Sequence, residues 1–344
     1  MKKKSKIFKA GLLTILVLLS LAFTACRSKD AQIENKPEQK SEETAKAEVK
    51  EETDNKAKPE DKEGSDKLVL SAMKGPTAMS LAPLKESDKY QIDVKGTIEE
   101  EMAALQKSEA DIFLVPSNLY AKLQNKSGDL KVISPNIGSA LSLVGSKKIE
   151  SADDLKTATI SLTGKGAIPE AILKQVLKEY NLSENDLKLN FVQDPSEAIP
   201  QLLKDQSAYA LLPEPFASAS IAKNESLIKV SDISEVWKEK GLPPIITSVI
   251  VAKKDVYDQK KEAIDAFVKD YNEGVNSLKA DPSKFSKTIE EMGIVKAPIA
   301  EKSIPNIEFL TYENEDFKEK LADFLKIILD LNPDLIGGKV PETE

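Results

Sequence analysis

Short apolar runs alternate with helical patterns along the chain from residue 67 to residue 254. Between these runs, segments such as 97–109 and 168–180 repeat apolar residues every three or four positions, which is typical of amphipathic helices. Strands that alternate with helices predict an α/β fold with mainly parallel sheets flanked by helices. The runs that predict strands are 67–72, 90–96, 111–116, 130–135, 139–145, 157–162, 187–192, 207–212 and 245–254.

After residue 254 the pattern predicts helices only, at 255–279, 283–292 and 314–331. Local signals also mark where one earlier helix begins. Asp194 precedes Pro195, and Glu197 follows three positions after Asp194. This spacing predicts an N-cap, a proline at the first helical position and a capping box.

Two of the predicted strands, 139–145 and 245–254, are similar in character and flank a self-contained segment of about 146–245. If both strands cross between lobes, the chain leaves a first lobe, builds a second and returns. Such double connections form a hinge beside a ligand cleft. We therefore predict lobe 1 at about 67–140 and 250–344, and lobe 2 at about 141–249.

The N-terminus carries five lysines in its first nine residues, an apolar run at 11–23, the small residues Thr24 and Ala25, and then Cys26. An apolar run this short indicates a secretory signal and not a spanning helix. The arrangement resembles a bacterial lipoprotein signal peptide, 1–25, although Phe23 stands where leucine is usual. The resemblance implies that Cys26 is lipidated and anchors the protein to the extracytoplasmic face of the cell membrane. The alternative is a signal peptide followed by an incidental cysteine.

The segment after the cysteine has a different composition. Residues 27–66 contain no aromatic residue and carry 9 basic and 13 acidic residues in 40. Such a segment buries too little apolar area to offset the entropy of ordering. We predict that residues 26–66 comprise the lipidated cysteine and a disordered tether, with a solvated helix as the alternative.

Residue types that the chain lacks exclude several functions. It has no histidine, which removes imidazole metal sites and Ser-His-Asp or Cys-His catalysis. Cys26 is the only cysteine and Arg27 the only arginine, so an intrachain disulfide and an arginine clamp on a carboxylate are excluded. The net charge of −8 disfavours nucleic acid as a partner. We expect no metal, no cofactor and no enzymatic activity.

Four stretches in their order resemble the extracytoplasmic solute-binding proteins of ABC transporters, of the nitrate/sulfonate/taurine type that includes thiamine-precursor binders. They are KGPTAM (74–79), ADIFLVPSNLYAKL (110–123), the segment 142–177 and SAYALLPEPFASA (207–219). The likeness covers about 67–330, with departures at Gln206, where glycine is usual, and at Pro83. It implies a two-lobed periplasmic-binding-protein type II fold, a small-molecule ligand, a permease and its ATPase as partners, and a monomer.

Three turns are candidates for ligand contact, because each places polar groups at the start of a helix. The first pairs Pro76 with a threonine hydroxyl, and the second offers a hydroxyl and an amide. The third contains two glycines that let backbone approach a ligand, although Glu170 would compete with an anion. The residues of these turns are Gly75, Pro76, Thr77, Ala78, Ser117, Asn118, Thr163, Gly164, Lys165, Gly166 and Ala167.

Further candidates lie near the proposed crossing. Glu214, between two prolines, either accepts a hydrogen bond from a ligand or stabilises the helix that follows. Ser139 and Ser248 lie on the predicted crossing strands. Trp237, the only tryptophan, is expected in the core, with the cleft as the alternative.

The sequence thus predicts the membrane-anchored binding subunit of an ABC importer. Without an arginine in the body, an anion would be held by helix N-termini, hydroxyls and Lys165, which suits a sulfonate or a nitrate-like group. A neutral ring such as a thiamine precursor also remains open. The alternatives are a sensing or adhesive surface lipoprotein without transport, and an enzyme. Pyrimidine-forming and menaquinone-pathway enzymes share the fold, and the former depend on histidine and cysteine.

Overall fold

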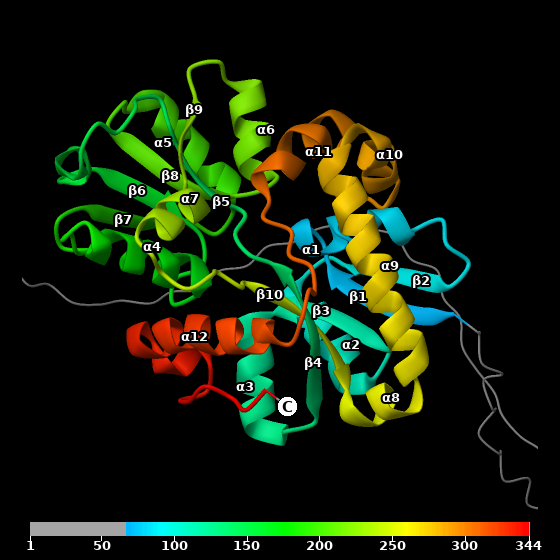
Figure 1. Cartoon of the computed structure of the whole chain (residues 1–344). Helices are drawn as coiled ribbons and strands as arrows, with labels where there is room; N and C mark the ends of the chain where they lie inside the picture. Colours follow the sequence, from blue (N-terminus) through cyan, green and yellow to red (C-terminus); the bar gives the residue numbers. More distant parts are fainter. Residues whose placement is uncertain (1–66, 344) are drawn as a thin grey trace, which may run out of the picture. The chain divides into compact units, whose positions relative to one another are not determined.

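The structure, a computed structural model, describes residues 67–343, which lie in one compact unit (Figure 1). Ten strands in these residues form two five-stranded sheets. The predictions for the signal peptide, Cys26 and the tether fall on residues 1–66, outside the described residues.

The first sheet, sheet A, has the strand order β2-β1-β3-β10-β4. Its centre is apolar because β1 and β3 are buried on both faces by helices, as the apolar run of β3 and that of β1, interrupted by Ser71, indicate. β1 runs parallel to β2 and β3, whereas β10 is antiparallel to both of its neighbours. The strands are β1 (Leu68–Met73), β2 (Tyr90–Lys95), β3 (Ile112–Pro116), β4 (Leu130–Ile137) and β10 (Ser248–Lys253).

The second sheet, sheet B, has the order β7-β6-β8-β5-β9 and repeats the same plan. β6 runs parallel to β7 and β8, whereas β5 is antiparallel to β8 and β9. The strands are β5 (Leu141–Gly145), β6 (Thr159–Leu162), β7 (Lys188–Phe191), β8 (Ala208–Pro213) and β9 (Ile228–Asp232). We call sheet A with its helices lobe 1, and sheet B with its helices lobe 2.

Helices cover both sheets. The predicted N-cap at Asp194 is confirmed, because its carboxylate accepts a hydrogen bond from Ser196 N, and Pro195 is the first residue of the 3-10 helix Pro195–Ala198. The predicted capping box is not formed, because Glu197 accepts from Gln193 N and not from the backbone of Asp194. The α-helices are α1 (Pro76–Met79), α2 (Ile98–Lys107), α3 (Ser117–Ser127), α4 (Ile168–Glu179), α5 (Ile199–Lys204), α6 (Phe216–Lys223), α7 (Ile233–Glu239), α8 (Lys254–Gln259), α9 (Lys261–Ala280), α10 (Ser283–Glu291), α11 (Ala297–Ser303) and α12 (Asp316–Leu331).

The α/β fold class is confirmed, but both sheets are mixed and not mainly parallel. Each contains two parallel and two antiparallel pairings. The antiparallel strands, β5 and β10, are the first strand after each passage between the sheets. Each of them runs opposite to the parallel strands of its sheet, because the chain enters the sheet at the end where those parallel strands finish.

The chain passes between the sheets twice, but through shorter segments than the predicted crossing strands. β5 lies in sheet B and β10 in sheet A, so the links are 138–140 and 240–247. Residues 307–310 pair with the first link, through hydrogen bonds of 2.8 Å from Gly138 N to Glu308 O and from Glu308 N to Ser139 O. A third segment therefore lies beside the links, and the sequence did not indicate it.

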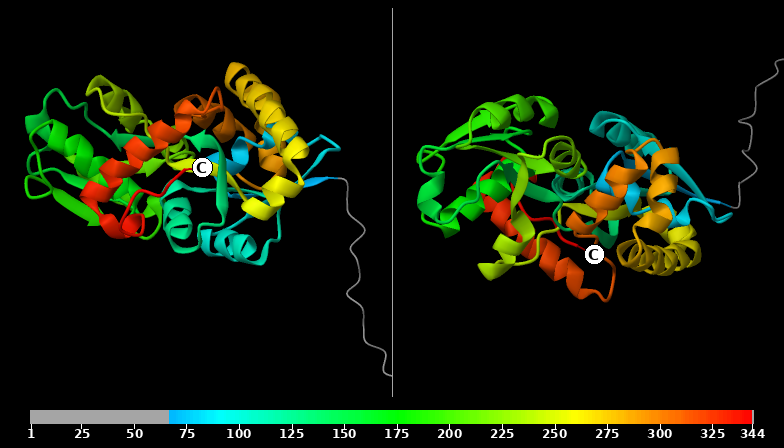
Figure 2. Two further views of the ribbon diagram at one scale, coloured as in Figure 1. Left: turned by 60° about the horizontal axis from the view of Figure 1, so that its bottom comes forward. Right: turned by 90° about the horizontal axis from the view of Figure 1, so that it is seen from above.

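The C-terminal helix α12, drawn red in Figure 2, packs against α4 of lobe 2, although we predicted it in lobe 1. Its apolar face is fully covered, with Leu321, Phe324 and Ile328 buried. Phe324 meets the buried Trp237 edge to face at 6.3 Å between ring centroids. The core position expected of Trp237 is confirmed, since its Nε1 also donates to Pro243 O at 2.6 Å.

Three short elements were missed by the sequence patterns: β9, α7 and α11. β9 has no fully buried residue, and α7 and α11 have seven residues each, so their apolar periodicity spans too few positions. None of the helices in residues 67–343 combines the length and the apolar character that a membrane span requires.

Candidate functional site

A cavity of about 440 Å³ lies between elements of the two lobes. Lobe 1 contributes the turns that follow β1 and β2, lobe 2 contributes the start of α6, and the loop before α11 closes the wall. Of the residues predicted to contact a ligand, Gly75 lines it directly. The lining residues are Lys74, Gly75, Gly96, Pro215, Phe216, Ala219, Ile294 and Val295.

The turn after β1 has a backbone that favours glycine. Gly75 has φ +127°, and Pro76 occupies the first position of α1, as predicted. The amides of Thr77 and Ala78 lie in the first turn, where backbone N–H groups have no acceptor within the helix. The Thr77 hydroxyl, expected to serve a ligand, instead donates to Met73 O because the turn brings that carbonyl within reach.

The opposite wall is apolar and partly open to solvent. Phe216, the first residue of α6, is 39% exposed, and it is one of two large apolar side chains exposed to this degree in residues 67–343. Pro215 and Ala219 continue this wall, and Ile294 and Val295 face it from the loop before α11. The single charged side chain of the lining is Lys74, which is exposed. The cavity thus combines one cation with an apolar surface.

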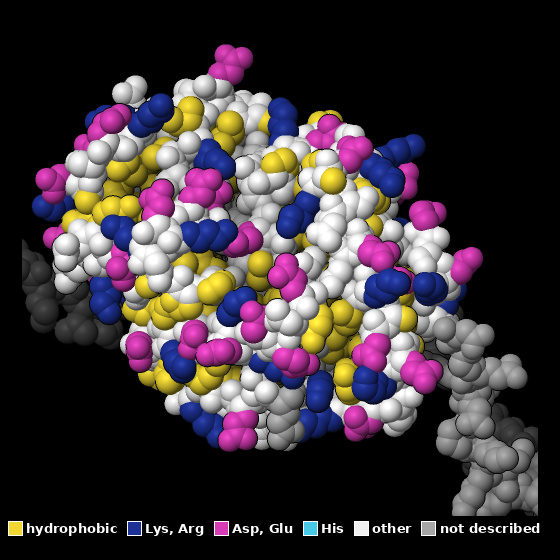
Figure 3. Space-filling view, in the orientation of Figure 1, with side chains coloured by type: hydrophobic (Ala, Val, Ile, Leu, Met, Phe, Trp, Pro, Cys, Tyr) yellow, Lys and Arg dark blue, Asp and Glu magenta, His cyan; other side chains and the backbone are white. Residues whose placement is uncertain are grey.

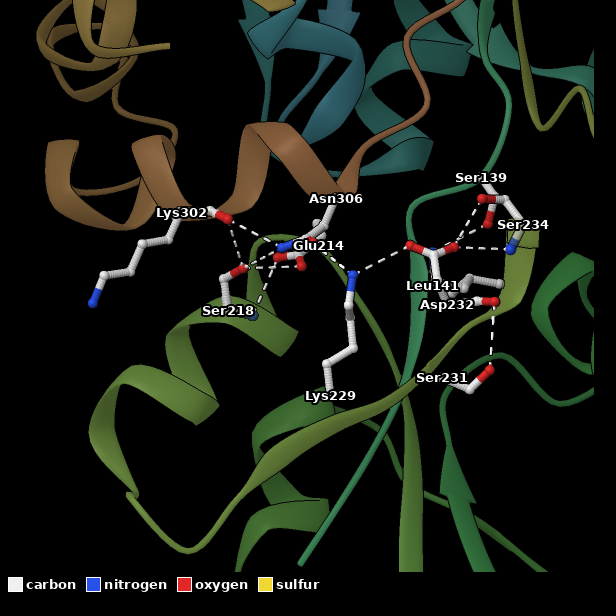
Figure 4. Close-up of polar contacts among 10 residues, drawn as sticks. All are labelled: Ser139, Leu141, Glu214, Ser218, Lys229, Ser231, Asp232, Ser234, Lys302 and Asn306. Carbon is white, nitrogen blue, oxygen red and sulfur yellow. Dashed lines mark hydrogen bonds and ion pairs between the residues drawn. The ribbon is translucent and has the colours of Figure 1, made fainter. Parts of the chain in front are cut away.

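Glu214 lies directly before this wall but does not line the cavity. Its carboxylate is buried and accepts hydrogen bonds from Ser218 N at 3.2 Å and from Ser218 Oγ at 3.0 Å (Figure 4). Burial raises the pKa of Glu214 to about 7, against the lowering effect of Ser218 and Asn306. Of the two roles open to Glu214, the geometry displays the one in which it stabilises the start of α6.

The same carboxyl group belongs to a polar cluster that joins lobe 2 to the end of α11, which packs against α6 (Figures 1 and 4). Asn306 Nδ2 donates to Ser218 Oγ at 3.2 Å and to Lys302 O at 3.0 Å. Lys229, from β9, donates to Asn306 Oδ1 at 2.8 Å and lies 3.5 Å from Asp232. These contacts hold one wall of the cavity in place.

The turn at 163–167, which we predicted to contact a ligand, does not line this cavity. Gly164 and Gly166 have the positive φ values, +77° and +70°, that favour glycine. The amide of Gly166 is already used, because it donates to the Glu170 carboxylate at 2.5 Å. Gly166 and Ala167 instead border a small cavity beside Leu331 and Leu335, at the end of α12.

The other members of this turn are also outside the cavity wall. Lys165, proposed as a contact for an anion, has its Nζ 5.5 Å from the centre of the Phe191 ring. Thr163 is half-buried at the end of β6. The helix packing of lobe 2, with α12 against α4, determines what this turn faces, and the local sequence does not carry that information.

The remaining candidates serve the links between the lobes. Ser248 Oγ donates to Val115 O at 3.1 Å and to Asn136 Oδ1 at 3.0 Å, and Ser139 Oγ accepts from Leu141 N at 3.3 Å. Ser117 N donates to Thr247 O at 2.9 Å, and the buried Ser117 Oγ has no hydrogen-bond partner among the described residues. Neither these residues nor Asn118 line the cavity.

Besides Gly75, sequence reasoning singled out none of the lining residues. Lys74, Gly96, Pro215, Phe216 and Ala219 stood within quoted stretches, whereas Ile294 and Val295 did not. The one signal in the sequence was an aromatic residue, Phe216, directly after Glu-Pro.

The distribution of charged side chains and the residues that could bind a metal ion complete the description of the site. Lysine and acidic side chains are interspersed over the face shown in Figure 3. Within residues 67–343, no group of three or more histidine, cysteine, aspartate or glutamate side chains is arranged to hold a metal ion. The residues that line the cavity include one charged side chain, Lys74, and no carboxylate.

The model of a protein family described as "Menaquinone biosynthesis" matches residues 76–312. This range includes both links and the part of the cavity wall from Gly96 to Val295, whereas Lys74 and Gly75 precede it. A comparison with curated protein sequences gives no match.

Solved structures share the fold over most of the chain. An ABC transporter protein from Parabacteroides distasonis is 23% identical with a TM-score of 0.69, covering 80% of this chain and 97% of that one. The periplasmic aliphatic sulphonate binding protein SsuA from Escherichia coli is 14% identical with a TM-score of 0.64, covering 81% and 91%. The alkanesulfonate-binding protein SsuA from Xanthomonas axonopodis pv. citri, bound to MOPS, is 14% identical with a TM-score of 0.58, covering 80% and 96%.

Proposed function

The chain belongs to the menaquinone biosynthesis family, and we propose that within this family it is a solute-binding protein, the extracytoplasmic binding subunit of an ABC importer. In this proposal it captures a small solute between its lobes and delivers it to a permease with its ATPase. It acts as a monomer, and lipidation of Cys26 holds it on the outer face of the cell membrane, with residues 27–66 as a tether.

The observation that carries the proposal is the composition of the cavity between the lobes. Its wall combines one cation, Lys74, with the apolar side chains of Phe216, Ile294 and Val295. Binding sites for small molecules are concave and mainly apolar, with few polar groups that fix the orientation of the ligand. A wall without a carboxylate suits a binding protein better than an enzyme that transfers protons.

The same wall favours one class of solute, a small organic anion with an apolar part, such as an alkanesulfonate. Lys74 would pair with the anionic group, and Phe216 would cover the apolar part. Two of the solved structures that share the fold are sulfonate-binding proteins, which supports this choice at the level of the fold. Nitrate-like anions and thiamine-precursor-like rings are the other members of the test panel.

Closure would occur about the segments that link the lobes. Thr247 N donates to Ile137 O at 2.8 Å, so the second link lies against the end of β4. Residues 307–310 lie against the first link. Few chain segments join the lobes here, and such connections absorb the backbone rotation of a hinge.

Isothermal titration calorimetry of the purified full chain with alkanesulfonates of increasing chain length, nitrate, carboxylates and pyrimidines tests the binding role. We expect saturable, one-to-one binding of one class. Lys74→Gln should weaken binding of an anion by about ten- to a hundredfold, since a charge-assisted hydrogen bond contributes about 1.5–3 kcal/mol. Lys85→Gln, at an exposed lysine outside the cavity, is the matched control.

Phe216→Ala separates the apolar contact from the ionic one. Covering a phenylalanine contributes about 1.5–3 kcal/mol, so this variant should lose about tenfold or more in affinity for long-chain sulfonates and less for the shortest. Leu203→Ala, at the other exposed large apolar side chain, should leave the affinity unchanged. The absence of binding across the whole panel would contradict a transport role and favour a sensing or adhesive lipoprotein.

Membrane anchoring has its own experiment. Mass spectrometry of the chain from bacterial membranes should detect acyl groups on Cys26 as the N-terminal residue, and Cys26→Ser should release the protein from the membrane fraction. An unmodified cysteine in a released chain would disprove the anchor.

A second candidate function is an enzyme of menaquinone biosynthesis, because the family model spans more than half of the chain. Two buried carboxyl groups, Glu101 and Glu214, have pKa values raised to about 7 and are the acid–base candidates, although neither lines the cavity. Deletion of the gene and quantification of cellular menaquinone distinguish the two. A loss of menaquinone that Glu101→Gln and Glu214→Gln fail to restore would favour the enzyme.

A further inference from the structure

A second cavity, of about 260 Å³, lies within lobe 2 and shares no residue with the cavity between the lobes. It is bounded by α4, α7, β5, β6 and β9, together with the 3-10 helix at Ala152–Leu155. Its floor is formed by side chains that are at most 3% exposed, among them Ile160, Leu173 and Leu177. This floor belongs to the core of the lobe and is therefore already formed before any ligand arrives.

The rim of this cavity is also apolar but half-buried, and it includes Val230, Val236 and Tyr180. Lys240 approaches the rim, yet it is engaged there, with Nζ 3.8 Å from the centre of the Tyr180 ring and 3.4 Å from Glu179 O. A cavity with an apolar rim and an apolar floor offers few hydrogen-bond partners to water, because a stable buried water needs two to four polar partners.

The charges of the two cavities differ in sign. The lobe 2 cavity is lined by one carboxylate, Glu150, which is exposed, and by no lysine. The cavity between the lobes is lined by Lys74 and by no carboxylate. An organic anion that suits the cavity between the lobes is therefore disfavoured in the lobe 2 cavity.

We propose that the lobe 2 cavity is a separate binding site for an uncharged, mainly apolar ring compound that carries one hydrogen-bond donor. An apolar cavity of about 150 Å³ holds a single benzene ring, so this larger volume accommodates two fused rings. The rings contact Leu173 and Leu177 of the floor, and the donor is directed to the Glu150 carboxylate at the rim. The site is independent of the proposed solute site, because no lining residue is shared.

Methyl-detected NMR of the full chain with naphthol as the probe tests the site directly. Saturable chemical-shift changes should appear for the methyl groups of Ile160, Leu173 and Leu177. The methyl signals of Ile294 and Val295 should not change. Naphthalenesulfonate, with the same rings and a negative charge, should leave the lobe 2 methyl groups unshifted. Naphthol shifts confined to Ile294 and Val295, or no saturable binding up to about 1 mM, would overturn the proposal.

Two variants identify the contacts. Ala152→Phe, which fills the cavity from its half-buried rim, should weaken naphthol binding by at least about tenfold, and Val230→Phe repeats the test from another element. Glu150→Gln should weaken binding of naphthol but not of naphthalene, which has no donor. Unchanged naphthol affinity in folded Ala152→Phe and Val230→Phe would disprove the site.

Ala219→Phe, in the wall of the other cavity, is the matched control. It should leave naphthol affinity within about twofold of the parent and impair only sulfonate binding. Because the two ligands report on different cavities, loss of sulfonate binding leaves the lobe 2 proposal standing, and loss of naphthol binding leaves the solute-binding role standing.

Discussion

The carboxylate of Glu214 accepts two hydrogen bonds from Ser218, one from the backbone N–H at 3.2 Å and one from the hydroxyl at 3.0 Å. The same hydroxyl accepts a hydrogen bond from Asn306, in the segment that follows α11. A single buried carboxyl group therefore connects the start of α6 to a segment that is 88 residues away along the chain from Ser218. Its protonation state bears on how firmly these two segments are joined.

We predict that Glu214→Gln removes a pH-dependent loss of stability. Burial raises the pKa of Glu214 from 4.5 to about 7, so the native state binds this proton more tightly than the unfolded chain. The free energy of unfolding consequently falls as pH rises from about 4.5 to about 7, and is unaffected by this group below that window. The contribution amounts to roughly 3 kcal/mol at most.

The measurement is urea denaturation from pH 4 to pH 8. Glu214→Gln should be more stable than the parent at pH 8 and similar to it at pH 4, while Glu225→Gln, at an exposed position, should follow the parent. Parallel pH profiles for the parent and Glu214→Gln would show that the carboxyl is not neutral in the folded protein.

We predict that Glu101, on α2 of lobe 1, also makes the free energy of unfolding fall as pH rises. It is fully buried on α2, Ser71 Oγ donates to its Oε2 at 2.6 Å, and its Oε1 has no hydrogen-bond partner among the described residues. Burial raises its pKa to about 7, so Glu101→Gln should also flatten the loss of stability between pH 4.5 and pH 7. Since the two sites share no partner, the double variant should show the sum of both changes. A double variant no flatter than either single variant would refute independent titration.

Asn136 should be the most sensitive polar residue at the junction of the lobes. Its Nδ2 donates to Tyr271 Oη at 2.8 Å and to Ser80 Oγ at 3.0 Å, and its Oδ1 accepts from Ser248 Oγ at 3.0 Å. Asn136→Leu leaves three buried hydroxyl groups without this partner, so we expect a loss of about 2–4 kcal/mol in the free energy of unfolding. Chemical denaturation measures it, with the half-buried Asn118→Ala as a control expected within about 0.5 kcal/mol of the parent. Equal losses in both variants would contradict a special role for the network.

Gly138 allows a double-mutant test of the third segment beside the links. A methyl group added at Gly138 would lie 2.7 Å from Cδ and 2.9 Å from Cγ of Glu308, and Glu308 pairs with Lys238 at 2.5 Å. Gly138→Ala should therefore displace the Glu308 side chain from Lys238 and destabilise the fold by about 1 kcal/mol, because the clashing atoms belong to a flexible side chain and not to backbone. Glu308→Ala alone should cost about 1 kcal/mol or less, because Lys238 is largely exposed.

In the Glu308→Ala background the cost of Gly138→Ala should largely disappear, since the clashing atoms are gone. Thermal unfolding of the four proteins gives the coupling energy. Additive effects would mean that residues 138 and 308 do not pack against each other in solution.

Elements defined by neighbouring residues could be predicted from the sequence. The helix at 168–180 is observed as α4, and the N-cap at Asp194 is formed as its spacing indicates. Which of the candidate turns line the cavity could not be predicted from the sequence. Gly75 reaches the cavity, whereas the turn at 163–167, which contains two glycines, faces the end of α12. Leu331, at that end, is 165 residues later in the chain than Gly166.

The sequence by itself determined the α/β class, the predicted strand segments, the absence of histidine chemistry and the expectation of two lobes. Only the tertiary structure placed Lys74 and Phe216 in the wall of one cavity and packed α12 against lobe 2. It also placed Glu214 outside that wall, where its carboxylate accepts a hydrogen bond from Ser218. Periodicity and capping arise from groups a few residues apart, so they can be predicted from local sequence. Contacts between distant segments depend on which apolar faces pack together, as α12 and α4 do here although they lie far apart in the chain, and local sequence does not carry that information.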